Sequence, residues 1–189
     1  PRTLWRLHGI RPLNHPQRRL ALAAHWAASE KFISHIEDWG IDVAAARQGA
    51  ANQAGRVRRS AGTPPRLMEI LHPPRDAFWT HHLTLRSARC AKPQLLLGEA
   101  RVTDLAVNAI LPWLHARAKE GRNAPLQSAI ETTYSEWPAA EDNSTLKLAR
   151  ERLLGSPDAK LFSTAATQQG LLQVVRDFCD HSNAICDQC

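Results

Sequence analysis

The sequence predicts a mainly α-helical fold, a single helical domain of five to six helices with at most a short β-hairpin. Its 189 residues, 43% of them hydrophobic, suffice to bury one core of ordinary size. Apolar residues recur at helical spacing through residues 16–36 and again through residues 99–121. Prolines and glycines stand between such stretches, where they start or end helices. We therefore expect a soluble, globular protein with one helical core.

The first predicted helix covers residues 16–36. Pro12 and Pro16 push the residues before them out of the helical region, so the chain should be extended before the helix begins. Asn14 or His15 is expected to cap the helix, with Pro16 in its first turn, where the missing N–H costs nothing. The apolar positions are Leu20, Leu22, Ala23, Trp26, Ala27, Phe32, Ile33 and Ile36. Their spacing predicts a long and largely buried helix.

The segments that follow are shorter and less regular. Residues 44–65 combine small residues, three glycines and a group of arginines, which predicts a flexible basic loop or a weak helix. A short helix is expected at residues 66–71, because Pro73 and Pro74 come directly after His72 and end it. The alternation of HHLTLR at residues 81–86 favours one short strand or hairpin arm.

The clearest apolar stripe predicts a helix over residues 99–121, in which Gly121 supplies the C-terminal cap. Pro112 lies inside this helix and cannot donate a hydrogen bond to the carbonyl of Asn108, four residues back. The helix should therefore bend and leave that carbonyl in need of another partner. We interpret Asn108 and Pro112 as a structural kink rather than a binding feature. The apolar stripe consists of Val102, Leu105, Ala106, Ala109, Ile110, Trp113 and Leu114.

Three more helices are predicted in the last third of the chain. They cover residues 124–137, 144–154 and 163–180, with caps expected at Asn123, at Asn143 or Ser144, and at Ser163. Cys179 lies in the last turn of the final helix, and residues 180–189 form a Cys-rich tail. We assign all of residues 1–189 to one domain.

Positive charge is concentrated in the first half of the chain. Residues 1–101 contain 16 Lys and Arg against 7 Asp and Glu, a net +9, whereas residues 102–189 contain 8 against 11, a net −3. This asymmetry suits a polyanion, because cations that meet phosphates release counterions. The alternative is that these arginines only solvate the surface, and Arg11 can instead bridge to a core carboxylate. The candidate nucleic-acid-binding residues are Arg11, Arg18, Arg19, Arg56, Arg58 and Arg59.

Three of the four cysteines lie in the last eleven residues, at positions 179, 186 and 189. Cys186 and Cys189 form a C-x2-C pair whose thiolates can grip one ion, and Cys179 adds a third ligand. Zinc and the common iron–sulfur clusters need a fourth, for which Cys90 is the candidate by softness, with His181 or a residue elsewhere as alternatives. Free thiols in a disordered tail, or a redox pair, remain the other interpretations.

Cellular setting and chemistry are constrained mainly by what the sequence lacks. Cysteines this sparse argue against the disulfide framework of a small secreted domain, so we expect a reducing, cytoplasmic setting. No apolar run approaches the roughly 20 residues of a membrane-spanning helix. There is no H-E-x-x-H, no phosphate-cradling glycine loop and no G-x-S-x-G elbow, so no catalytic residue is assigned.

Four stretches taken together resemble a known family. They are Trp5 with GIRPLNHPQRR at 9–19, FWTHHL at 78–83, LLGEARVTDLAVNAILPWL at 96–114, and QQGLLQVVRDFCDHSNAICDQC at 168–189. Their order is similar to that of an uncharacterised bacterial family, domain of unknown function 2851. The resemblance implies that the chain is the C-terminal half of a longer protein, whose N-terminal half is nuclease-like and carries the chemistry. The Arg-rich segment 44–65 departs from the family pattern.

Two functions are consistent with these observations. In the first, the chain is a non-catalytic helical module that supports the nuclease-like N-terminal half and contacts DNA or RNA through a basic face. In the second, it is a structural or protein-interaction domain with no nucleic-acid role, and its arginines are ordinary surface residues. Salt-dependent binding to nucleic acid distinguishes them, because only phosphate contacts release counterions.

Overall fold

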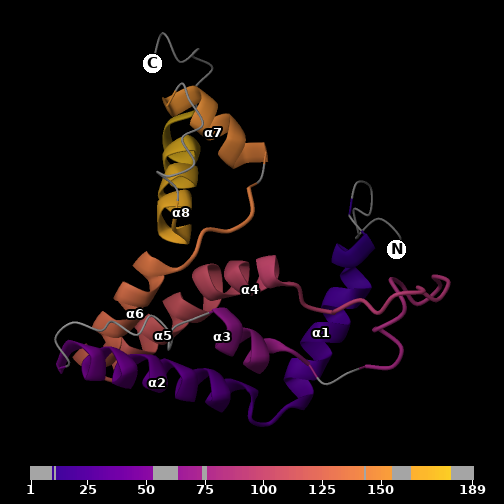
Figure 1. The fold of residues 1–189 in the computed structure, drawn as a ribbon, viewed down its shortest axis with the longest axis horizontal. Helices are drawn as coiled ribbons and strands as arrows, with labels where there is room; N and C mark the ends of the chain where they lie inside the picture. The colour runs from indigo at the N-terminus through magenta and orange to yellow at the C-terminus, as the bar shows by residue number, and fades with distance from the viewer. Residues whose placement is uncertain are drawn as a thin grey trace.

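The computed structural model describes residues 10, 12–52, 64–73, 76–142, 144–154 and 163–179. Helices α1 to α6 form a broad body, and α7 and α8 form a hairpin that rises from one side of it (Figure 1). The prediction of a mainly helical fold is confirmed. Within the described residues there is no β-strand, and the β-type pairing there is a single antiparallel bridge between Pro138 and Thr164.

The first predicted helix is divided in two. A 3-10 turn, Pro12–Asn14, leads into α1, Pro16–Ala28, and the side chain of His15 caps α1 by accepting a hydrogen bond from the Gln17 amide. The backbone of Ser29 is extended, so the helix stops there and α2 begins at Phe32. The break lets the Trp26 and Phe32 rings stack with centroids 5.1 Å apart. The prediction of one helix over residues 16–36 was therefore wrong at residues 29–31.

Helix α2 is longer than the sequence indicated. It covers Phe32–Asn52, so the flexible loop expected from residue 44 is helical as far as residue 52. Small residues at 44–46 and 50–51 explain this, because alanine is the best helix former. The rest of the predicted loop, including Arg56, Arg58 and Arg59, lies outside the described residues apart from its end, where α3, Pro64–Leu71, begins.

The helix predicted at residues 99–121 contains the expected irregularity. Helix α4 covers Glu99–Leu105 and α5 covers Leu111–Glu120, and between them Ala106–Ile110 form a π-helical turn. The Leu111 amide donates to the Ala106 carbonyl, five residues back, directly before Pro112. A widened turn is one of the recognised ways in which a helix adapts to a proline that cannot donate. Gly121 caps α5, as predicted.

The last three helices start close to their predicted positions. Helix α6 covers Ala124–Glu136 and is capped by Asn123, whose side chain accepts a hydrogen bond from the Leu126 amide. Helix α7 covers Ser144–Leu154. Helix α8 covers Ala165–Val174 and continues as a π-helical segment, Val175–Cys179. Its cap is Thr164 rather than Ser163, because the Thr164 hydroxyl accepts from the Thr167 amide.

The main core lies between α1 to α6 and is centred on two tryptophans. Trp39 of α2 and Trp137, which follows α6, are each 1% exposed and meet edge to face at 6.2 Å. Helices α2 and α5 approach closely at Gly40, where an added Cβ would lie 3.2 Å from the Leu114 side chain. Around them pack Leu22, Ile36, Val43, Leu67, Leu71, Leu97, Val102, Ala106, Val107, Ile110, Leu111, Ile130 and Ala165.

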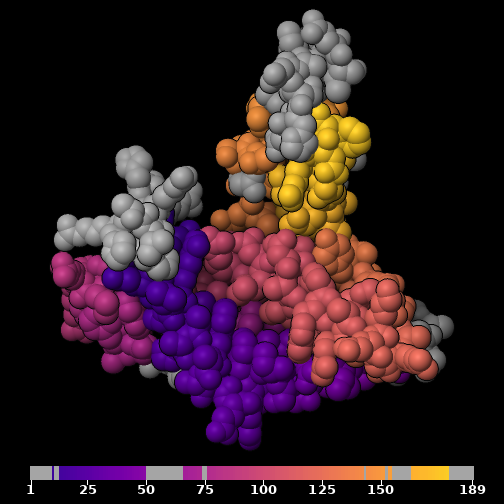
Figure 2. Space-filling model, turned by 180° about the vertical axis from the view of Figure 1, so that it is seen from behind, coloured from indigo at the N-terminus to yellow at the C-terminus, as the bar shows by residue number. Residues whose placement is uncertain are grey.

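The α7–α8 hairpin has a small apolar core of its own, made of Leu146, Ala149, Leu171 and Val175. The space-filling view shows the hairpin standing off the body (Figure 2). It is attached at its base, where the Gln168 side chain bonds to both the amide and the carbonyl of Ala140. A second attachment joins Gln169 to Asn108, in the π turn. None of the helices in the described part of the chain is long and apolar enough to span a bilayer.

Candidate functional site

The connection between α3 and α4 is the largest irregular segment that the structure describes. Residues 76–97 contain only turns and bends, although residues 81–86 were predicted to form a strand or hairpin arm. That prediction was wrong. Connections longer than about 12–15 residues without secondary structure are uncommon in compact domains and often carry function. The loop lies beside α1 in Figure 1.

Arg18 of α1 is buried under the loop and holds it in place through hydrogen bonds. Its side chain is 1% exposed. Its two terminal nitrogens donate to four backbone carbonyls of the loop: Trp79 at 2.8 Å, His82 at 2.6 Å, Gln94 at 3.4 Å and Leu95 at 2.7 Å. The planar guanidinium offers five donors in a fixed fork, so one side chain can hold two stretches of backbone at once. Arg18 thereby joins the beginning of the loop to its end.

This position of Arg18 differs from the exposed one that the sequence suggested for it. We expected Arg18 to contact nucleic acid, but its guanidinium is buried and its terminal nitrogens are occupied by the loop carbonyls. Burial lowers the pKa of Arg18, an effect that the nearby Cys90 thiol opposes. Within the described residues it has no carboxylate partner, and its Nε has no hydrogen-bond acceptor. Its neighbour Arg19 is exposed and remains a candidate.

Backbone hydrogen bonds fold the loop back on itself. The Cys90 amide donates to the His81 carbonyl and the Gln94 amide donates to the Thr80 carbonyl, both at 2.7 Å. Residues 90–94 therefore run alongside residues 80–81. The Ser87 hydroxyl oxygen accepts from the amides of Leu83 and Thr84, and this local turn replaces the expected strand.

The turn at the start of the loop is capped by Asp76. One of its carboxylate oxygens accepts from the amides of Phe78 and Trp79, each at 2.9 Å, and the other lies 2.9 Å from His25 Nε2. The hydrogen bond from the Trp79 amide is the main reason that the pKa of Asp76 is lowered, and the contacts with His25 and Phe78 act in the same direction. Partial burial opposes them. Asp76 thus stabilises the loop in its ionised form.

The lowered pKa of Asp76 predicts a loss of stability in acid. Because the folded-state pKa lies below the unfolded value of about 3.9, the stabilisation is present above that value and is lost as pH falls through the folded pKa. Asp76→Ala should therefore melt below the wild type at about pH 5, and the difference between the two melting temperatures should be smaller at about pH 2.5. Thermal denaturation at both pH values measures this. A gap that stays constant or widens in acid would contradict the assignment.

An aromatic turn stands at the surface of the loop. The rings of Phe78 and His82 stack with centroids 4.1 Å apart and 4° between their planes. The Trp79 ring meets Phe78 edge to face at 5.1 Å. His82 Nδ1 also bonds to the Phe78 carbonyl at 2.9 Å, so the stacked pair is held within one helical turn. Phe78 is nevertheless 37% exposed, so part of its surface is in contact with solvent.

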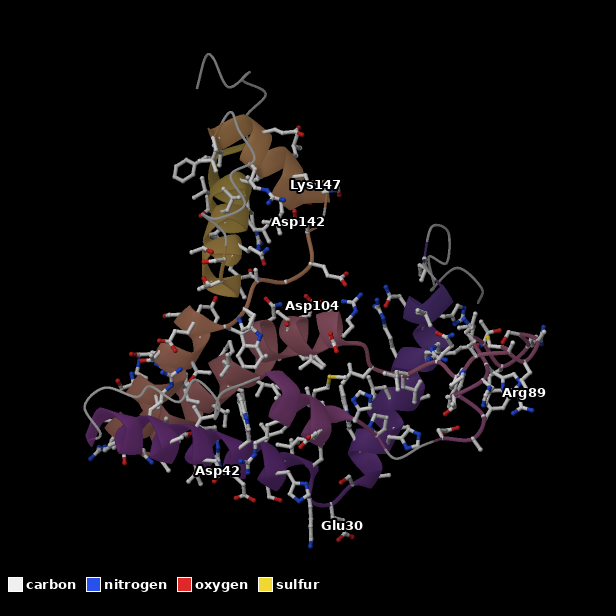
Figure 3. The ribbon with its side chains drawn as sticks, viewed as in Figure 1. Glu30, Asp42, Arg89, Asp104, Asp142 and Lys147 are labelled. Atoms are coloured by element: carbon white, nitrogen blue, oxygen red, sulfur yellow. The ribbon has the colours of Figure 1, made fainter. Side chains whose placement is uncertain are left out.

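Three cations lie on the same loop. Arg86, Arg89 and Lys92 are exposed, and within the part of the chain that the structure describes none of them forms an ion pair. Residues 77–98 contain no Asp or Glu. Figure 3 shows Arg89 at the outer edge of the loop, with its side chain directed away from the body. The surface of the loop therefore presents positive charge beside an aromatic turn.

These three cations were not among the predicted contact residues, because they do not form a cluster along the chain. The predicted arginines at 18–19 and 56–59 are adjacent or nearly so. The signal for the loop cations was the acid-free segment from 77 to 98, which contains FWTHH at 78–82 and three cations. A count of missing acidic residues, rather than of grouped basic ones, would have selected it.

The predicted cysteine site is not assembled by the described residues. Cys90 is a free, half-buried thiol in the loop. Cys179 ends the π-helical segment after α8, in the hairpin, whereas Arg89 next to Cys90 lies at the opposite side of the body in Figure 3. Cys186, Cys189 and Arg11 fall outside the described residues. Within those residues no group of three or more His, Cys, Asp or Glu side chains could hold a metal ion.

A family model described as "Protein of unknown function (DUF2851)" matches residues 1–144. The match ends at the residue where α7 begins, so it contains the whole body with the loop and leaves out the hairpin. Neither the curated proteins nor the solved structures contain a sequence or fold that matches.

Proposed function

The chain belongs to the DUF2851 family of proteins of unknown function, and on that premise we propose that it is a non-catalytic helical module that contacts nucleic acid through the loop of residues 76–97. The loop belongs to the part that the family shares. The single observation that carries the proposal is the set of Arg86, Arg89 and Lys92, which are exposed and form no ion pair within the described residues, on the acid-free segment 77–98 of a loop held by Arg18. Cations of this kind are the usual means of contacting phosphates.

The order of the loop strengthens this reading. A surface cation on a mobile loop loses conformational freedom when it binds, whereas these three project from a backbone already fixed by Arg18, Asp76 and Gln17. The exposed Arg19 lies one residue from Arg18 on α1, beside the loop. The contact surface therefore extends from the loop to the start of α1, with the predicted residue Arg18 beneath it as a support.

The wider setting is part of the same proposal. We propose that this module is part of a longer cytoplasmic bacterial protein, next to a nuclease-like N-terminal part that would supply the chemistry. The module would then hold the polyanion while the neighbouring part acts on it.

Neutralising the loop cations tests the proposal. The triple variant Arg86→Gln, Arg89→Gln, Lys92→Gln should bind mixed-sequence DNA or RNA at least about tenfold more weakly at low salt. The slope of log affinity against log salt should fall by about 2–3, because about one counterion is released per phosphate contact. Filter binding over a series of salt concentrations measures both quantities.

A matched control removes the same charge elsewhere. Lys31 before α2, Lys119 on α5 and Lys147 on α7 are exposed, and their conversion to Gln lowers the net charge by the same amount. This control should change the salt slope far less than the loop triple does. Equal effects of the two triples would mean that net charge alone governs binding, and no salt-dependent binding by the wild type would remove the proposal.

A second candidate function rests on a different surface. The α7–α8 hairpin exposes Leu148, Leu153, Leu154, Val174 and Phe178, the last at 65%. Apolar side chains gathered on a projecting element suit a protein partner. In that case the module is a structural or interaction domain, and the loop triple leaves its function unchanged.

The terminal cysteines belong to the proposal as a separate site. We place a metal, zinc or an iron–sulfur cluster, between Cys179, Cys186 and Cys189, with a fourth ligand other than Cys90, since Cys90 lies in the loop on the other side of the body. Metal analysis with an absorbance spectrum distinguishes iron from zinc. Cys90→Ser should leave the metal content unchanged.

A further inference from the structure

The aromatic turn indicates which form of nucleic acid the loop would bind. We infer that the loop binds single-stranded nucleic acid, with the Phe78 ring as a stacking surface for an unpaired base and Arg89 and Lys92 as its phosphate contacts. This inference rests on the proposed function and makes it more specific. It follows from the placement of a partly exposed, stacked aromatic ring on the same loop as cations that form no ion pair within the described residues.

The ring and the cations are held close together by the backbone of the loop. The Cys90 amide bonds to the His81 carbonyl, and the Gln94 amide bonds to the Thr80 carbonyl. Arg89 and Lys92 therefore stand on the stretch that runs alongside the turn from Phe78 to His82. A ring and cations on adjoining stretches suit a nucleotide, whose base and phosphate are neighbours. Proteins that bind single strands combine exactly these two elements, an aromatic platform and a cationic track.

The conformation of Phe78 is set before any ligand arrives. Its amide donates to Asp76, its carbonyl accepts from the His81 amide and from His82 Nδ1, and its ring is stacked on His82. A partly exposed ring with this many constraints loses little freedom on binding. In the absence of a ligand its exposed surface is in contact with water, which costs free energy that stacking on a base recovers.

A single strand fits this surface better than a duplex. In a duplex the bases stack on one another and their faces are not accessible, so a protein ring reaches them only after unstacking a base pair step. A single strand offers every base face without that cost. Phosphate contacts are common to both forms, so the loop cations should assist both, whereas the ring should assist only the single strand.

The experiment is a fluorescence anisotropy titration of the full chain with three labelled probes of equal length: a mixed-sequence single strand, its duplex, and a strand of abasic sites. Phe78→Leu keeps an apolar side chain of similar size and removes the ring. It should weaken single-strand binding by about 5- to 100-fold, the value of one base stack, and leave duplex and abasic binding within about twofold. Phe78→Trp should restore single-strand affinity.

Leu85→Ala is the matched control. Leu85 is 63% exposed on the same loop and has no ring, so its removal should leave single-strand binding unchanged. Unchanged single-strand binding by Phe78→Leu overturns the inference, and if the loop-cation triple still weakens binding then the proposed function stands. Equal losses from Phe78→Leu and Leu85→Ala, or tighter binding to the duplex than to the single strand, also overturn it. Binding to none of the probes removes the inference and the proposed function together.

Discussion

Arg18→Ala is expected to lower the free energy of unfolding by about 3–5 kcal/mol, the largest effect of any single substitution in the loop region. The variant leaves four loop carbonyls without the charged donor that holds them. A hydrogen bond to a charged group contributes about 1.5–3 kcal/mol, and water that enters the opened loop replaces part of the total. Urea denaturation followed by circular dichroism measures the change.

Two further variants distinguish the hydrogen bonds of the Arg18 guanidinium from its positive charge. Arg19→Ala removes the same side chain from the next, exposed position and should change stability by less than about 0.5 kcal/mol. Arg18→Lys keeps the charge but concentrates its donors on one nitrogen, which cannot reach both ends of the loop, so it should recover only part of the loss. If Arg18→Ala proves as stable as Arg19→Ala, the loop is not held by the guanidinium.

Trp137→Ala is expected to lower the free energy of unfolding by about 3–5 kcal/mol as well, through a different mechanism. The Trp137 side chain is 1% exposed and packs against Trp39, and its Nε1 donates to the Thr103 hydroxyl at 3.4 Å. Its removal leaves a cavity where α2, α4 and α6 meet. The Trp137 carbonyl also accepts from the Ala165 amide, so the attachment of the hairpin is affected too.

Trp113→Ala provides the comparison for this substitution. Trp113 is only half-buried and its ring lies 6.0 Å from the Arg117 guanidinium, so water can fill the space left by the ring. Its loss should be clearly smaller than that of Trp137→Ala, and Trp137→Phe should recover most of the stability. Thermal denaturation of the three variants under one condition gives the ranking. A larger loss for Trp113→Ala would contradict the position assigned to the core.

The local signals in the sequence predicted the fold well. The caps at His15, Asn123 and Gly121 and the irregular helix before Pro112 depend on residues within one or two turns, so a reader of the sequence can find them. The break at Ser29 escaped notice because no proline or glycine marks it. It is favoured by the tertiary contact between Trp26 and Leu71, whose carbonyl accepts from the indole nitrogen at 2.9 Å.

The candidate site was harder to predict because it depends on contacts between distant positions. Arg18 donates hydrogen bonds to carbonyls 61 to 77 residues further along the chain, and no periodicity in the sequence predicts such a contact. A backbone carbonyl is available from every residue, so the sequence does not indicate which ones an arginine will meet. The exposed loop cations were also hard to predict, because their importance comes from the absence of Asp and Glu in residues 77–98 and of ion pairs to them within the described residues.

The π turn at Ala106–Ile110 changes the direction in which the two ends of one helix present their side chains. One additional residue in a turn rotates all later side chains by about 100° relative to an unbroken α-helix. Helix α4 can thus pack on α3 while α5 packs on α6 and approaches Gly40. The continuous helix from α4 to α5 can therefore pack against two neighbouring helices. The rotation of its side chains at the π turn, more than its composition, determines how the helices of the body pack together.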